Sequence, residues 1–311
     1  MIAAPIGDNL LRPFQLERSA LRGRLVRLGG LVDRVLTGHD YPEPVSRLLG
    51  ELLVLAATLA GGLKFRGTFS LQVKATGPVS LMIADCTNDG AMRGFAKFDA
   101  GGVAVAAGGG VPDLLGEGHL ALTVDQSEAG QTYQGIVELS GATLTECMQT
   151  YFRQSEQVKT GIEVAVGRVV VHRVGDRDQQ RWRAGGIMVQ RLPEQVAEGR
   201  EDEMEEDWRR TMLLLGSATE AELVDPHLAP ERLLLRLFHE EGVRVFRPLG
   251  LSFGCRCSRA RVEAMLRRFP PAELDDMKEA DGHLVVTCEF CSATYRFDEA
   301  ELAALHGGLR H

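Results

Sequence analysis

Four cysteines near the carboxyl end of the sequence are the residues whose type and spacing best support chemistry. Two form a Cys-x-Cys pair and two form a Cys-x-x-Cys pair, with 30 residues between the pairs. Each pair can supply two thiolate ligands from one turn, as a tetrahedral zinc site requires. Clustered thiols can also form disulfides, so the same residues could respond to oxidation. The four are Cys255, Cys257, Cys288 and Cys291.

The ligand set predicts a single structural zinc ion, because four cysteines leave no open coordination position. Thiolates also favour zinc over hard cations. His283 and His306 are alternative ligands, although histidines in such positions more often pack or face solvent. Cys86 and Cys147 lie in apolar segments and are interpreted as core cysteines without a role.

Two arginines flank the Cys-x-Cys pair, Arg256 and Arg259. Nearby cations lower the pKa of a thiol and favour the thiolate that peroxide attacks. The same arginines could instead offset the negative charge of a zinc centre with four thiolates. Both interpretations remain open from the sequence.

The elements around the cysteines predict a small zinc-binding module over residues 251–311. A helix is expected from Arg259 after the cap residue Ser258, and a second over residues 271–279. Strands at 283–287 and 293–297 form a hairpin that presents the Cys-x-x-Cys pair at its turn. A module this small has little core, so loss of zinc should unfold it.

The preceding residues 193–250 predict a charged helical linker. Residues 194–210 contain eight acidic and three basic side chains. The apolar residues that follow have helical spacing, interrupted by Pro226 and Pro230. Short helices depend on tertiary packing for stability, which favours a marginally folded linker. A stable helical subdomain at the surface is the alternative.

Residues 1–192 mix strands and helices without regular βαβ alternation, which predicts an α+β core domain. A buried helix is expected over residues 45–60 and strands over much of 66–140. A further helix over 144–157 would be capped by Thr143 and Glu146, and residues 162–174 and 183–191 would form a hairpin. The glycine pairs and triplets at 101–102 and 108–110 are interpreted as loops.

Composition excludes several classes of function. The chain of 311 residues has a net charge of −8, which disfavours a nucleic-acid partner, and the cysteine module itself carries eight basic and ten acidic residues. We expect no signal peptide and no membrane span. No phosphate-binding GxxxxGK[ST] motif occurs, so ATP hydrolysis is not indicated. A thiol–disulfide oxidoreductase and a zinc-stabilised scaffold without switching remain alternatives.

Several motifs together resemble the redox-regulated molecular chaperones of heat-shock protein 33 type, and they extend over essentially the whole chain. They are Cys-Arg-Cys-Ser-Arg at 255–259, Val-Thr-Cys-Glu-Phe-Cys at 286–291, Tyr-Phe-Arg-Gln-Ser-Glu-Gln at 151–157, His-Asp-Tyr-Pro at 39–42, Arg-Gly at 93–94, Tyr-Gln-Gly-Ile-Val-Glu-Leu at 133–139 and Gly-Gly-Ile-Met-Val-Gln at 185–190.

The resemblance implies a bacterial cytosolic holdase that needs no ATP, is not an enzyme, and is inactive when reduced and zinc-bound. Oxidation would form the disulfides Cys255–Cys257 and Cys288–Cys291, release zinc and unfold the linker. The protein would then form a homodimer, bind unfolding client proteins and pass them to ATP-dependent foldase chaperones. In this reading Cys288 and Cys291 are the more direct peroxide sensor.

Overall fold

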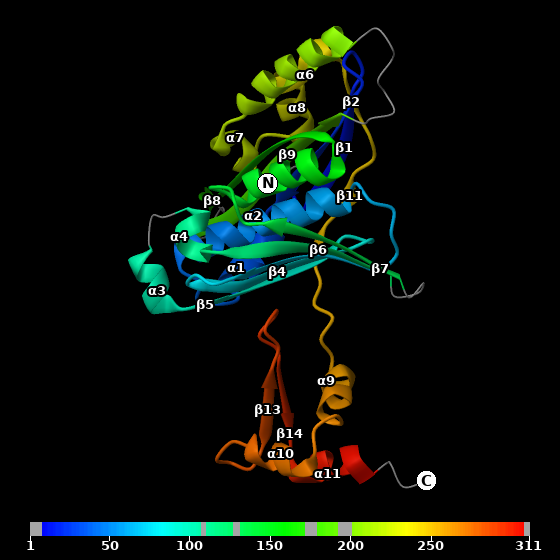
Figure 1. Cartoon of the computed structure of the whole chain (residues 1–311). Coiled ribbons are helices and arrows are strands. Elements are labelled where there is room, and N and C mark those ends of the chain that lie inside the picture. The colour runs from blue at the N-terminus through cyan, green and yellow to red at the C-terminus, as the bar shows by residue number, and fades with distance from the viewer. Residues whose placement is uncertain (1–7, 107–109, 127–130, 172–178, 192–200, 308–311) are drawn as a thin grey trace. The chain divides into compact units, whose positions relative to one another are not determined.

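The computed structural model describes residues 8–106, 110–126, 131–171, 179–191 and 201–307. The chain divides into two compact units, Met1–Phe253 and Gly254–His311, and each is described by itself (Figure 1). The predicted mixture of strands and helices is confirmed. Among the described helices, none is both long and apolar enough to cross a membrane.

The first sheet of the larger unit is antiparallel and joins both ends of that unit's sequence. Its order is β10 (Val243–Val245), β1 (Leu10–Leu16), β2 (Leu21–Leu28), β9 (Gln179–Arg191) and β8 (Lys159–Val171), while β11 (Leu249–Gly250) also pairs with β1. The predicted hairpin is therefore present as β8 and β9; its expected turn falls largely outside the described residues.

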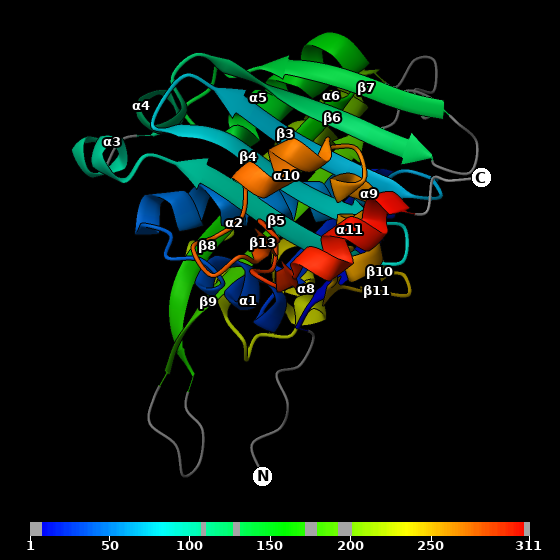
Figure 2. The ribbon, with the colours of Figure 1, turned by 90° about the horizontal axis from the view of Figure 1, so that it is seen from below.

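The second sheet has six strands, most of them visible in Figure 2. Their order is β12 (Ser252–Phe253), β5 (Ala91–Phe98), β4 (Val79–Thr87), β3 (Thr68–Ala75), β6 (Gly118–Gln126) and β7 (Gln131–Glu138). Two short helices, α3 (Ala100–Val105) and α4 (Val111–Leu115), separate β5 from β6. The interpretation of residues 101–102 as a loop was wrong. They lie in the first turn of α3, where the Asp99 carboxylate accepts from the Gly102 amide. Most of the 108–110 triplet lies outside the described residues.

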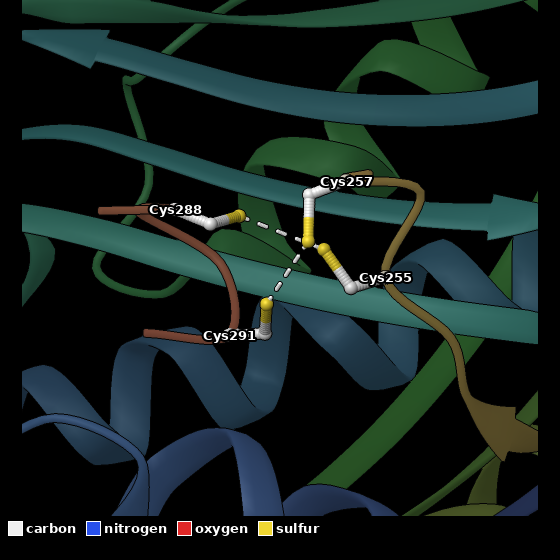
Figure 3. A group of neighbouring side chains, drawn as sticks. All are labelled: Cys255, Cys257, Cys288 and Cys291. Carbon is white, nitrogen blue, oxygen red and sulfur yellow. Dashed lines mark hydrogen bonds between the residues drawn. The ribbon is translucent and has the colours of Figure 1, made fainter. Parts of the chain in front are cut away.

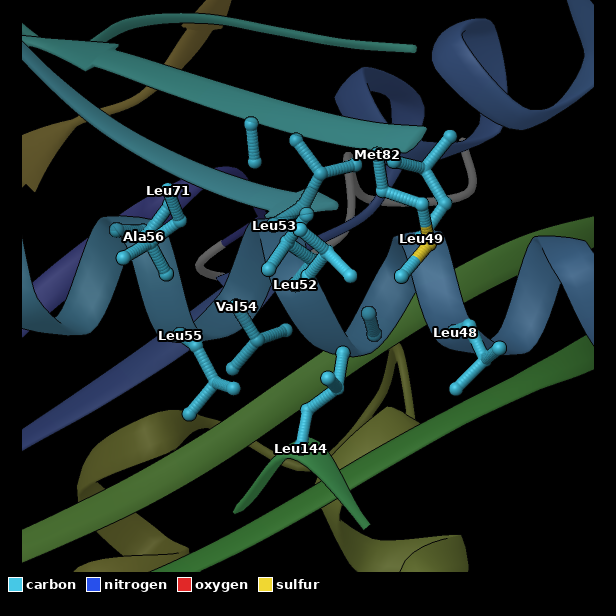
Figure 4. Packing of buried hydrophobic residues seen from close by; sticks show 14 of the residues in the cluster. Leu48, Leu49, Leu52, Leu53, Val54, Leu55, Ala56, Leu71, Met82 and Leu144 are labelled. Atoms are coloured by element: carbon cyan, nitrogen blue, oxygen red, sulfur yellow. The ribbon is translucent and has the colours of Figure 1, made fainter. Parts of the chain in front are cut away.

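The helix α2 (Glu43–Ala60) forms the centre of the main core and contacts both sheets. Its leucines pack against Leu71 and Met82 of the second sheet and against Leu144 of α5 (Leu144–Tyr151), as Figure 4 shows. Gly50 permits close packing on β8, because a Cβ there would lie 2.6 Å from Cγ1 of Val166. The prediction of a buried core helix is confirmed. The shorter α1 (Gly30–Thr37) packs beside it.

The predicted helix over 144–157 is only partly α-helical. Thr143 caps α5 by accepting from the Glu146 amide, as expected, but the Glu146 carboxylate accepts from Ala142 instead of closing a capping box. The chain then forms a π-helical turn, Phe152–Glu156, and ends it at Gln157 with a left-handed φ of 54°.

The segment predicted as a linker is folded against the first sheet from residue 201 onward. It contains α6 (Glu201–Gly216), α7 (Glu220–Val224), α8 (Pro230–Phe238) and the 3-10 turn His239–Glu241. Leucines of these helices form a second core with the face of the sheet that α2 does not cover. The sheet contributes Phe14, Leu16, Leu21, Leu25, Ile187 and Val189.

The smaller unit contains α9 (Arg259–Leu266), α10 (Pro271–Asp276), the hairpin β13 (Leu284–Thr287) with β14 (Thr294–Phe297), and α11 (Glu299–Gly307). The unit begins at Gly254, after the predicted boundary at 251, because Ser252 and Phe253 pair with β5 of the larger unit. Its buried apolar core is small. It consists of Val262, Leu266, Leu274, Leu284, Phe297, Leu302 and Leu305.

Candidate metal centre

The Cys-x-x-Cys pair is held by a knuckle at the turn of the β13–β14 hairpin. The Cys288 amide donates to the carbonyl of Ala293 at 2.9 Å, and the Ser292 amide donates back to the carbonyl of Cys288 at 2.8 Å. Ser292 adopts a left-handed φ of 57°, which lets the chain turn sharply after Cys291. The predicted hairpin geometry is therefore observed.

The Cys-x-Cys pair lies in the extended segment that leads into α9. Ser258 begins that helix as expected, since its hydroxyl accepts from the Arg261 amide at 3.3 Å. This cap fixes the direction in which the chain leaves Cys257. The two pairs, 30 residues apart in sequence, converge on one point (Figure 3).

All four sulfur atoms lie within 4.8 Å of one another. Two Sγ–Sγ contacts join the pairs, at 3.6 Å from Cys255 to Cys288 and 3.3 Å from Cys257 to Cys291. All are free thiols, since a disulfide would bring two sulfurs to about 2.05 Å. Zinc–sulfur bonds of about 2.3 Å in a tetrahedron place sulfurs about 3.8 Å apart. The cluster could therefore hold a metal ion.

The thiols are half-buried and differ in acidity. Burial opposes ionisation of Cys255, but hydrogen bonds from the Cys257 amide and the neighbouring thiols outweigh it and lower its pKa to about 7. Burial raises the pKa of Cys288 and raises that of Cys291 to about 12. Cys255 is therefore a stronger acid than Cys288 and Cys291.

Tyr295 supports the cluster from β14, and the sequence analysis did not identify it. Its hydroxyl donates to Sγ of Cys257 at 3.1 Å, and this hydrogen bond raises the pKa of the tyrosine to about 12. The period-2 pattern of the return strand places Tyr295 and Phe297 on one face. This pattern is the feature of the sequence from which the position of Tyr295 could have been predicted. Hydrogen bonds of this kind orient metal ligands and tune their basicity.

Arg259 is engaged elsewhere than at the sulfurs. Its guanidinium donates to the Arg296 carbonyl at 3.0 Å and to Glu301 at 2.6 Å, and lies 4.3 Å from the centre of the Phe297 ring. It therefore ties α9 to β14 and α11. Its proposed role of stabilising the thiolates is not supported by these contacts.

Of the two alternative ligands, His283 does not join the cluster. His283 lies beside Asp281, with its Nδ1 3.4 Å from that carboxylate, and the group of four that could hold a metal contains cysteines alone. The side chain of His306 lies outside the described part of the structure. Cys86 and Cys147 are buried in the main core, where burial raises the pKa of both thiols, that of Cys86 to about 12.

Comparison with known proteins decides the family. Residues 8–298 match the family model described as Hsp33 protein. The chain belongs to the Hsp33 family. It is 40% identical over 296 residues to the 33 kDa chaperonin of Caulobacter vibrioides, covering 94% of this chain and 95% of that one. It is 39% identical over 297 residues to the 33 kDa chaperonin of Azotobacter vinelandii, with 95% and 93% covered.

The fold also matches a solved Hsp33 structure. The crystal structure of the 33 kDa chaperonin (heat shock protein 33 homolog) from Thermotoga maritima superposes with a TM-score of 0.75, covering 96% of this chain and 98% of that one at 21% identity. This likeness shows the fold. Membership of the Hsp33 family supports a chaperone function, and the relatives' names describe a role that is not enzymatic.

The Hsp33-like segments outside the cysteine cluster have structural roles. Tyr41 lies within the main core, where its hydroxyl accepts from the Ala96 amide at 3.1 Å. Arg93 forms an ion pair with the buried Asp85 at 2.7 Å. The segment at 151–157 forms the π-helical turn after α5. These residues explain why the resemblance extends far beyond the four cysteines.

Proposed function

We propose that the chain is an ATP-independent holdase that oxidation of the four cysteines activates. The observation that carries the proposal is the convergence of four free thiols in a unit whose described residues contribute seven buried apolar side chains to its core. A unit this small depends on its cross-links for stability. A change in the state of the cysteines therefore changes whether the unit is folded.

In the reduced state the four cysteines would hold one zinc ion as a structural site. An all-thiolate set with no open position suits zinc and leaves no room for a catalytic water. Bound zinc supplies about 10–16 kcal/mol of apparent binding free energy to small domains of this type. The hairpin knuckle, the Ser258 cap and Tyr295 would hold the sulfurs in place for it.

Oxidation would join the cysteines as Cys255–Cys257 and Cys288–Cys291. In each case two thiolates would lose two electrons and form one S–S bond, while one hydrogen peroxide would take up these electrons and two protons from solvent to give two waters. The residues that ligate zinc are consumed, so the ion is no longer held. This pairing follows the family resemblance, whereas contacts between the pairs also join Cys255 to Cys288 and Cys257 to Cys291. Mass spectrometry of proteolytic peptides distinguishes the two patterns.

The charged linker would be the element that responds. Its helices cover the apolar face of the first sheet, and their release would expose a surface able to bind other apolar segments. The linker joins the cysteine unit through residues 243–253, which pair with the edges of both sheets. Loss of structure in the cysteine unit would allow this segment to dissociate from β1 and β5.

The partners that we propose are unfolding client proteins, a second copy of the chain in the oxidised state and, downstream, ATP-dependent foldase chaperones. The proposed location is the bacterial cytoplasm, where thiols stay reduced until oxidative stress. Binding of clients needs exposed apolar surface and no nucleotide, in keeping with the lack of a phosphate-binding motif in the sequence.

Light scattering of a heat-denatured client tests the function. The zinc-loaded reduced chain should leave aggregation unchanged, and the peroxide-treated chain should suppress it. Cys257→Ser should prevent activation by peroxide, while Cys86→Ala should not, because Cys86 lies in the main core. Equal suppression by the reduced and oxidised chains would contradict redox control, and no suppression by either would contradict the holdase.

A further inference from the structure

A groove of about 580 Å³ lies between the two sheets of the larger unit, beside the end of α2. Its size is within the range of about 300–1,000 Å³ that small-molecule sites occupy. The walls come from both sheets, from the loop after α2 and from the π-helical turn. Residues used in the argument are Arg24, Lys64, Phe65, Leu122, Val124 and Phe152.

The inner wall of the groove is apolar. Leu122 and Val124 point from β6 into it, and the half-buried rings of Phe65 and Phe152 flank them. Leu63, also in the lining, is 47% exposed. Such a surface favours an apolar chain, since burying these groups removes them from water.

The cation of Arg24 lies at the side of this apolar wall. Its Nη1 donates to Oε1 of Gln190 at 3.1 Å and to Sδ of Met188 at 3.4 Å, and both partners are neutral. Within the described residues, no carboxylate pairs with it. Burial, followed by the charge of Arg22, lowers the pKa of Arg24 to about 10, so the guanidinium remains charged at neutral pH.

The glycine that follows α2 makes room for this guanidinium. A Cβ on Gly62 would lie 2.4 Å from Nη2 of Arg24, so the arginine extends directly across the end of the helix. Lys64, two residues later, is exposed at the same groove and has no ion pair among the described residues. Two cations therefore border the apolar wall.

The acidic residue in the lining is already engaged. Oε1 of Glu156 accepts from the hydroxyl of Tyr151 at 2.7 Å and lies 3.4 Å from that of Tyr133. The π-helical turn Phe152–Glu156 places it there, and Gln157 closes the turn. The groove thus presents a net positive charge beside an apolar surface, which complements an anion attached to an apolar chain.

We propose that this groove binds a small amphiphile with a carboxylate head, of the long-chain fatty acid class. The carboxylate lies on Arg24 and Lys64, and the chain follows Leu122 and Val124. Binding requires neither oxidation of the cysteines nor release of the linker, so this site and the holdase activity can be tested separately.

Calorimetric titration of the full, reduced, zinc-loaded chain with dodecanoate and with dodecanol tests the site. Dodecanoate should bind at least tenfold more tightly, because the alcohol lacks the charge. Arg24→Gln should weaken dodecanoate binding at least tenfold and lower the preference for the acid, which Lys64 alone would then support. Arg22 is exposed on the same strand and does not line the groove, so Arg22→Gln should change the affinity for dodecanoate by less than about twofold.

Gly62→Ala provides a second variant that keeps the arginine but displaces its guanidinium, and it should weaken dodecanoate binding in the same direction. Equal affinity for the acid and the alcohol, no binding of dodecanoate, or no loss in either variant would overturn the proposal. So would displacement of dodecanoate from the groove by an apolar peptide ending in a free carboxylate, if that peptide bound much more tightly, because the ligand would then be a protein segment.

Discussion

The guanidinium of Arg27 on β2 donates to the main-chain carbonyls of Glu222 and Asp225 at the end of α7. Arg27 is 2% exposed, and burial, followed by the charge of Arg183, lowers its pKa to about 10. Arg183 on β9 donates in turn to the Val224 carbonyl and to Asp8. Two buried cations of the sheet thus hold the carboxyl end of a helix in the charged linker.

Arg27→Gln should loosen the linker without any oxidant. The carbonyls of α7 would lose buried donors, which costs about 1–3 kcal/mol. We expect faster proteolysis within residues 201–241 and partial client binding by the reduced protein. Arg22→Gln, exposed on the same strand, is the matched control and should behave as wild type. Unchanged proteolysis in Arg27→Gln would show that the hydrogen bonds from Arg27 to the carbonyls of α7 do not limit release of the linker.

The linker itself contains a buried charge, Glu241, which is fully buried and forms an ion pair with Arg210 of α6 at 2.6 Å. Arg210→Ala would leave this carboxylate buried without its guanidinium and should lower the free energy of unfolding by about 2–4 kcal/mol. Arg209→Ala removes an exposed ion pair with Glu206 and should cost less than about 0.5 kcal/mol. Urea titration followed by circular dichroism measures both, and equal costs would contradict the assigned role of Glu241.

Metal affinity should depend steeply on pH. Protons and metal compete for the same sulfurs, so affinity falls as pH falls. In the metal-free protein the raised pKa values of Cys288 and Cys291 keep both thiols protonated at pH 7, so binding displaces at least two protons. The apparent affinity should therefore rise at least about a hundredfold per pH unit between pH 6 and 7.

Competition with a chromophoric chelator at several pH values measures this slope. Removal of the metal should also unfold the smaller unit and loosen the linker, and it should leave the main core around α2 folded, because the apolar cores are separate. If the logarithm of the metal affinity rose by less than one per pH unit, fewer than one proton would be displaced, and thiolates would not supply the ligands.

Tyr295→Phe should weaken metal binding by about tenfold, as is usual when a hydrogen bond to a ligand is lost. The variant removes only the hydroxyl that donates to Cys257. Tyr133→Phe, in the larger unit, is the control. Equal affinities for the two variants would show that the O–H···S contact is not needed to hold the sulfurs.

The cysteine cluster was predictable because ligand spacing is a local property of the sequence. The Cys-x-x-Cys turn lies between two short strands with clear period-2 patterning, and Ser258 is a strong helix cap, so the supporting elements were also accessible. Local apolar periodicity likewise located α2 and most strands.

Features that depend on distant residues could not be derived in this way. The π-helical turn after Tyr151 interrupts a pattern that otherwise suits a helix. Arg27 lies among apolar neighbours in β2, and only the carbonyls of α7, nearly 200 residues later, explain its burial. The roles of β10, β11 and β12 depend on pairing across the whole larger unit.

That pairing has a consequence for synthesis on the ribosome. β1 begins at Leu10, yet one of its edges is completed by β10 and β11, and β5 receives β12 from residues 252–253. A nascent chain therefore exposes these edges until about residue 253 has left the exit tunnel, and unpaired edges invite pairing with other chains. The larger unit can close only after residues 252–253 have emerged, when the cysteine unit is already being made.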